Sequence, residues 1–181
     1  APPSYSTPIE LELAAYGTTV YALIYDDTDD KAANYSAAAF SFDKATIIDS
    51  LRSPDSWTPW TPVMLKWGGN DLESSLRISL IRLEPSGFLK ARLLFDPLNR
   101  TTVQPADAAA GIGDTVGPMV DFPDNWTAQL NNTIEEKAVF LSEAKMALDW
   151  HRDLVPYVYA ELKPDIFIQD TYTPNQMLES R

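Results

Sequence analysis

The chain has 181 residues, of which 45% are hydrophobic and 22% charged, enough to bury a core and too few charges for a disordered segment. Its formal net charge of −12 disfavours binding to a nucleic-acid backbone, and no apolar run of roughly 18 residues is present to span a membrane. Cysteine is absent and His151 is the single histidine. These counts exclude a disulfide framework, a thiolate nucleophile and a metal site built from several histidines of this chain.

The first half of the chain carries the patterns of antiparallel β-structure. Segment 9–13 (IELEL) alternates apolar and acidic residues, which predicts a half-buried strand. Segment 19–25 (TVYALIY) is apolar on both faces and predicts a central strand, and segment 35–42 is expected to return beside it. The acidic segment 26–31 (DDTDDK) between them favours a solvated turn over a calcium loop, because it lacks the glycine and glutamate spacing of an EF-hand.

A hairpin is predicted further along. Segments 75–84 (SLRISLIRLE) and 88–95 (FLKARLLF) flank Pro-Ser-Gly, which is typical of two strands joined by a short turn. A short strand is expected at 63–67, after a loop rich in proline and tryptophan at 53–62.

The pattern changes after residue 97. Residues 99–126 are rich in Gly, Pro, Ala and Asp and predict a long connection. Thr133 and Glu136 form a capping box, and the apolar spacing after it predicts a long helix. Pro156 is expected either to kink this helix or to start a second one, and Lys163-Pro164 to end it.

A short apolar segment, 165–168 (DIFI), directly follows this helix. The order of helix and then buried strand is the unit of a parallel α/β sheet, and one such unit cannot make a sheet alone. Its neighbouring strands are therefore expected outside this chain or in another copy of it. Together with a start at Ala1 rather than Met, this predicts a fragment of a longer protein.

Four segments carry a resemblance to a known family: 21–30 (YALIYDDTDD), 64–69 (MLKWGG), 116–123 (VGPMVDFP) and 164–181 (PDIFIQDTYTPNQMLESR). In this order they resemble bacterial members of the type I phosphodiesterase/nucleotide pyrophosphatase family, within the alkaline phosphatase superfamily, and the likeness extends from Tyr16 to Arg181. The resemblance implies an antiparallel β insert in an α/β core, followed by a helix and a strand that return to the core. The expected fold class is α+β, with the β insert at 1–105 and the linker, long helix and returning core strand at 106–181.

The resemblance also implies a set of metal ligands. In the family, Pro-Asp-x-x-x-His follows the returning strand, and the Asp and His bind a catalytic metal. The matching positions here are Pro174, Asn175 and Glu179, so both ligands depart from the pattern, and Asp170 is a further carboxylate that could join them. Oxygen ligands suit magnesium, calcium or manganese better than zinc. The family's nucleophile and remaining ligands have no match in this chain.

The sequence therefore predicts an inactive piece of a metal-dependent phosphodiesterase- or pyrophosphatase-like hydrolase whose parent holds divalent metal ions, zinc or another. Its expected partners are the remainder of its own catalytic core and, through the strand at 165–168, a second copy of itself. The alternative is a secreted or periplasmic binding module that uses the tryptophan-rich loop at 57–67 for carbohydrate or protein. For His151, helix-end charge is favoured over a catalytic role, since no motif places a nucleophile.

Overall fold

A computed structural model describes residues 6–28, 30–52, 57–95, 107–120 and 134–169. The chain divides into two compact units, Ala1–Leu98 and Asn99–Arg181. The sequence analysis placed this boundary after residue 105. Two antiparallel sheets and two α-helices make the α+β class a confirmed prediction.

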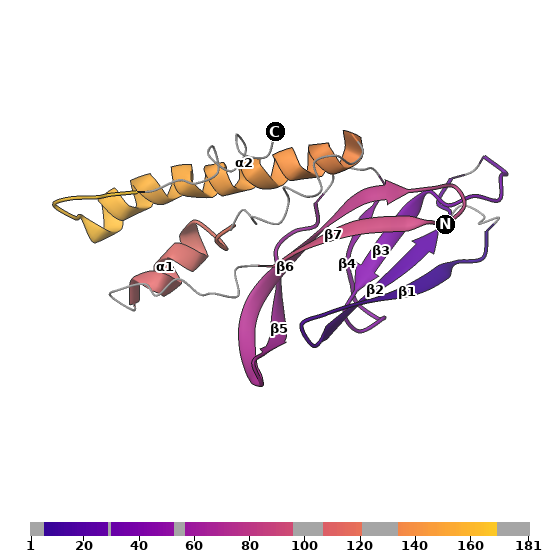
Figure 1. The fold of residues 1–181 in the computed structure, drawn as a ribbon, viewed down its shortest axis with the longest axis horizontal. Helices are drawn as coiled ribbons and strands as arrows, with labels where there is room; N and C mark the ends of the chain where they lie inside the picture. The colour runs from indigo at the N-terminus through magenta and orange to yellow at the C-terminus, as the bar shows by residue number, and fades with distance from the viewer. Residues whose placement is uncertain (1–5, 29, 53–56, 96–106, 121–133, 170–181) are drawn as a thin grey trace. The chain divides into compact units, whose positions relative to one another are not determined.

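The first unit holds both sheets (Figure 1). In the four-stranded sheet the strands follow chain order: β1 (Ile9–Ala15), β2 (Thr18–Tyr25), β3 (Ala37–Ser41) and β4 (Ile47–Leu51). The three-stranded sheet is also in chain order: β5 (Thr61–Trp67), β6 (Asn70–Leu83) and β7 (Leu89–Phe95). Every strand pair is antiparallel, as expected of strands joined by short turns.

The core of this unit lies between the two sheets. Successive side chains of a strand point to opposite faces, so alternate residues of β2, β3 and β6 turn inward. The fully inward cluster comprises Val20, Ala22, Ala38, Phe40, Leu51, Leu76, Ile78 and Leu80. Phe40 and Leu80 are 0% exposed, and partly buried residues of β1, β5 and β7 pack around the cluster.

The two sheets also meet where the turn between β1 and β2 approaches β5. Tyr16 and Gly17 form the turn between β1 and β2, and the carbonyl of Tyr16 accepts a hydrogen bond from the Lys66 backbone N–H at 2.6 Å. Gly17 has φ +72°, and a Cβ atom there would lie 2.6 Å from the Lys66 Cβ. Glycine at this position therefore serves both the left-handed turn and the close approach of the second sheet.

The second unit is helical in its described part. It contains α1 (Asp107–Thr115) and α2 (Ile134–Tyr157), which continues into a π-helical turn, η2 (Val158–Leu162). Pro156, which has no N–H to donate, lies two residues before this change. Lys163, with φ 48°, then ends the helix by donating its N–H to the Val158 carbonyl at 3.0 Å, at the position predicted from the sequence.

Three expectations differ from the structure. Strand β4 was not predicted, and α1 occupies part of the predicted connection at 99–126 because its alanines favour a helix. The prediction of a strand at 165–168 was wrong. This segment is irregular, and within the described residues no strand lies beside it to supply ladder hydrogen bonds. The predicted capping residues Thr133 and Glu136 fall where side chains are not described.

The junction of the two sheets can be tested with a matched pair of glycines. Gly17→Ala and Gly69→Ala both force alanine into a left-handed conformation, at about 1–2 kcal/mol each. Only Gly17→Ala adds a collision with Lys66, since nothing lies within 4 Å of a Cβ at Gly69. We expect Gly17→Ala to lower the free energy of unfolding by about 1–3 kcal/mol more than Gly69→Ala does, measured by amide hydrogen exchange of β2 and β6. Equal costs would contradict the close approach.

Candidate functional site

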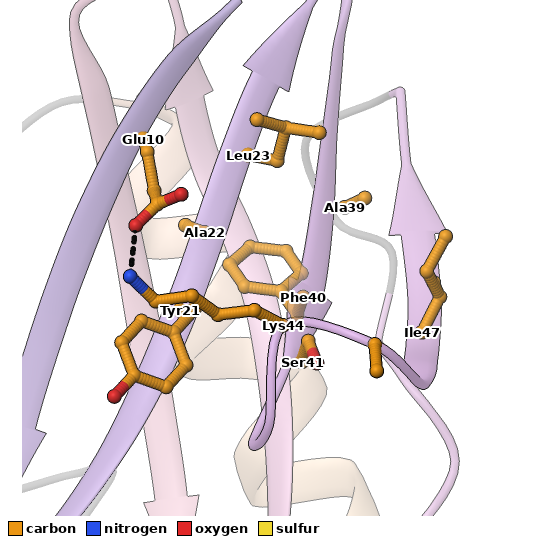
Figure 2. Close-up of a pocket in the computed structure, with 10 residues that line it drawn as sticks. Glu10, Tyr21, Ala22, Leu23, Ala39, Phe40, Ser41, Lys44 and Ile47 are labelled. Carbon is orange, nitrogen blue, oxygen red and sulfur yellow. Dashed lines mark hydrogen bonds and ion pairs between the residues drawn. The ribbon is translucent and has the colours of Figure 1, made fainter.

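A hollow lies on the outward face of the four-stranded sheet, above β3 (Figure 2). Strand register aligns outward side chains in two rows across the sheet: Glu10, Leu23, Ala39 and Ser50 in one, and Glu12, Tyr21, Ser41 and Ile47 in the other. The β3 member of each row is small: Ala39 lies between Leu23 and Ser50, and Ser41 lies between Tyr21 and Ile47. The resulting space, here called the sheet hollow, has a volume of about 180 Å3, and its lining consists of Glu10, Tyr21, Ala22, Leu23, Ala39, Phe40, Ser41, Lys44, Ala45 and Ile47.

The walls of the sheet hollow are apolar and open to solvent. Leu23 on β2 is 41% exposed and Ile47 on β4 is 64% exposed, whereas Ala39 on β3, the strand between them, is 6% exposed. Exposed apolar side chains around a depression, rimmed by polar groups, are typical of interaction sites.

One rim of the sheet hollow is charged. Lys44, in the turn between β3 and β4, extends past Tyr21 and forms an ion pair with Glu10 of β1 (Figure 2). Its Nζ lies 4.4 Å from the Tyr21 ring centroid and 3.7 Å from the Glu12 Oε1 atom. The hydrogen bond to Glu10 raises the pKa of Lys44, so the rim combines one ammonium with two carboxylates.

Asp43 holds the turn that presents Lys44. Its carboxylate accepts the backbone N–H groups of Ala45 at 2.9 Å and Thr46 at 2.7 Å, and also the hydroxyls of Thr46 and Ser41, each at 3.0 Å. These bonds, led by the Thr46 N–H, hold the pKa of Asp43 far below its usual range. Lys44 is thereby kept at φ 62°, an uncommon conformation for lysine.

The three predicted metal ligands, Asp170, Asn175 and Glu179, lie outside the described residues. Within the part of the chain that the structure describes, no group of three or more His, Asp or Glu side chains is placed to hold a metal ion. The sheet hollow was not foreseen. The alternation of Glu10 and Glu12 with inward leucines placed both glutamates on the outer face, but nothing in the sequence joined them to Lys44.

The tryptophans of segment 57–67 fall into two groups. Trp57 and Trp60 lie beside the Arg77 guanidinium, whose carbon is 6.0 and 5.5 Å from the two ring centroids. Trp67 stacks edge-on against Tyr16 at 5.4 Å. Trp60 and Trp67 are separated by the length of β5, roughly 20 Å at about 3.3 Å per residue, so the three rings do not form one platform.

His151 is held by contacts within α2 and the segment after it. Its Nδ1 lies 2.7 Å from the Gln169 Nε2, and its ring packs edge-on against Trp150 at 5.3 Å. Burial lowers the pKa of His151 below its usual value, which favours the neutral ring. An amide neighbour fixes the ring but activates no nucleophile, so these contacts give the histidine a structural role.

The described carboxylates of the acidic turn at 26–31 are used locally. Asp26 accepts the backbone N–H of Thr28 at 2.9 Å, and Asp30 accepts that of Ala32 at 2.8 Å. Asp27 bonds to Ser36 at 2.7 Å and pairs with Arg52; the Ser36 bond is the main cause of its lowered pKa. Hydrogen bonds of this kind are those of a turn.

A comparison of the chain with protein-family models, with curated proteins and with solved structures finds no match. Among the described residues, no helix combines the length and the apolarity that crossing a bilayer requires.

The turn below the sheet hollow predicts a pH dependence of stability. Because folding depresses the pKa of Asp43, its contribution is present above the ordinary carboxyl pKa of about 3.9 and is lost as the pH falls below it. Asp43→Asn keeps an acceptor oxygen but removes the charge. We expect the variant to be less stable than the wild type at neutral pH, and the difference in the free energy of unfolding to shrink in acid. Urea unfolding at neutral pH and at pH values below the ordinary carboxyl pKa measures this difference.

Thr46→Val serves as the partial control, because it removes one hydroxyl donor to Asp43 and leaves the carboxylate in place. Thr46→Val should lose part of the stability that Asp43→Asn loses at neutral pH. A difference between wild type and Asp43→Asn that does not change with pH would show that the charge of Asp43 does not organise the turn.

Proposed function

We propose that the chain is part of a metal-dependent phosphodiesterase- or pyrophosphatase-like hydrolase. It comprises a non-catalytic insert that serves recognition, and the segment that returns from this insert to the catalytic core. The observation that carries the proposal is the ordered set of four segments resembling that family. The sheet hollow adds a binding surface to the part that corresponds to the insert.

The independence of the β unit supports the insert role. Among the described residues, its inter-sheet cluster is made by residues between Leu11 and Phe95. An insert must carry a hydrophobic core of its own, because it stands outside the sheet into which it is inserted. A sandwich with a complete core and an exposed hollow can therefore contribute binding without contributing catalytic groups.

The proposed metal chemistry belongs to the parent enzyme. Asp170, Asn175 and Glu179 provide oxygen donors, a set that fits magnesium, calcium or manganese better than zinc. A bound metal would neutralise charge that develops during phosphoryl transfer. The remaining ligands and a threonine or serine nucleophile are expected in the flanking core.

A binding module that uses the tryptophan-rich segment is the second candidate, and one observation favours it. Trp67 is 51% exposed and Tyr16 is 43% exposed, so the edge-on pair they form leaves aromatic surface open at the turns of two hairpins. Aromatic surface of this kind binds sugar rings or protein side chains. If this pair is the binding surface, Trp67→Ala removes binding of the carbohydrate or protein ligand and Ile47→Ser does not.

Hydrolysis of bis(4-nitrophenyl) phosphate tests the hydrolase proposal. The substrate is offered to this chain and to the full-length gene product that carries it, each with Mg2+, Mn2+, Ca2+ or Zn2+. We expect metal-dependent turnover by the full-length product and none by the chain. Asn175→Asp restores the family's carboxylate and should lower the metal concentration that gives half the maximal rate.

Two results would count against the hydrolase proposal. One is a flanking sequence without the nucleophile and the remaining ligands. The other is a full-length product that is inactive with every metal. Either result leaves the binding-module candidate in place, because that candidate requires no phosphoryl chemistry.

A further inference from the structure

The size of the sheet hollow limits what it can hold. Pockets for small ligands usually measure about 300–1,000 Å3, whereas an apolar cavity of about 150 Å3 accommodates one benzene molecule. At about 180 Å3, the sheet hollow has room for one branched or aromatic side chain. It is also open on a sheet face, so a free small molecule would remain partly uncovered, while a residue on a polypeptide would bring neighbours to cover the rim.

The chemistry of the walls selects an apolar group. Leu23 on β2 and Ile47 on β4 line the sheet hollow from opposite sides of β3, Leu23 in the row of Ala39 and Ile47 in the row of Ser41, and both have surface left to bury. Burying such surface is favourable in proportion to its area, and a side chain fixed in a fitting depression is the usual anchor of a protein interface.

The charge of the rim selects what stands beside that apolar group. Lys44 pairs with Glu10, while the Glu12 side chain is 64% exposed and lies 3.7 Å from the lysine. Two carboxylates and one ammonium leave this rim net negative, on a chain whose formal net charge is −12. A partner with a cationic residue next to its anchor is therefore complementary, and an acidic partner is repelled.

We propose that the sheet hollow binds one bulky aliphatic or aromatic side chain of a polypeptide partner that carries an arginine or lysine beside it. The apolar side chain lies over Ala39 and Ser41 of β3, with Leu23 of β2 on one side and Ile47 of β4 on the other, and the cation reaches Glu12. This assignment deepens the proposed recognition role and rests on it, but its test needs no catalysis.

The probes are capped dipeptides added to the isotope-labelled chain, with binding followed by NMR shifts of backbone amides. Acetyl-Leu-Arg-amide and acetyl-Phe-Arg-amide carry both features, acetyl-Ser-Arg-amide lacks the anchor, and acetyl-Leu-Glu-amide reverses the charge. We expect the first two to shift amides of β2, β3 and β4 around the sheet hollow, with dissociation constants on the order of millimolar for ligands this small. The other two should bind at least about fivefold more weakly.

Variants of exposed residues locate the binding. Ile47→Ser removes one wall at a side chain that is 64% exposed, so folding is little affected, and should weaken the Leu-Arg probe about tenfold. Met64→Ser, at a 48% exposed residue of the other sheet, is the matched control and should leave binding unchanged. Glu12→Gln should weaken binding roughly two- to fivefold and reduce the preference over the Leu-Glu probe.

The assignment is overturned if the Ser-Arg probe binds as well as the Leu-Arg probe, since the attraction would then be charge alone. It is also overturned if no probe shifts these amides, if Ile47→Ser and Met64→Ser behave alike, or if the shifts gather at Tyr16 and Trp67 instead. If the probes bind but the hydrolysis test fails, the chain is a recognition unit whose parent is not the proposed hydrolase. If the hydrolysis test succeeds but the probes do not bind, the hydrolase proposal stands and only the proposed occupant of the sheet hollow is rejected.

Discussion

The inter-sheet core around Phe40 is the contact on which the β unit depends. Each sheet has an apolar face that must be covered, and here each sheet covers that face of the other. Phe40 of β3 and Ile78 and Leu80 of β6 are almost completely buried and bring the two sheets together. The Tyr16–Gly17 turn then brings one end of the first sheet within hydrogen-bonding distance of Lys66 in the second.

The sheet hollow is a consequence of that core. Because Ala38 and Phe40 point inward, Ala39 and Ser41 must point outward, and both are small. Leu23 and Tyr21 on β2 and Ile47 on β4 rise above them, which leaves a depression over β3. A shift of β3 by one residue would exchange the two faces, so the register that buries Phe40 also creates the sheet hollow.

The sequence predicted most of this unit where its pattern was strong. Segments with clear alternation or continuous apolar character became β1, β2, β6 and β7, with the turn after residue 84 as expected. Strand β4 has only two adjacent apolar residues, Ile47 and Ile48, and owes its conformation to pairing with β3. The charged rim was beyond sequence reasoning, because Lys44 and Glu10 are 34 positions apart and meet only through the fold of three strands.

The segment after the long helix shows why local composition could not settle the remaining structure. Residues 165–168 have the β-branched and aromatic composition of a strand, yet a strand needs a neighbour to complete its hydrogen bonds, and none lies beside it among the described residues. Phe167 packs edge-on against Tyr159 at 5.9 Å, while Ile166 and Ile168 are 79% and 88% exposed. One side of the segment thus meets the helix and the other offers apolar surface. A core strand of a parallel sheet is covered on both faces. Residues 165–168 are covered on one side alone, by the helix, so their strand-like composition does not produce a strand here.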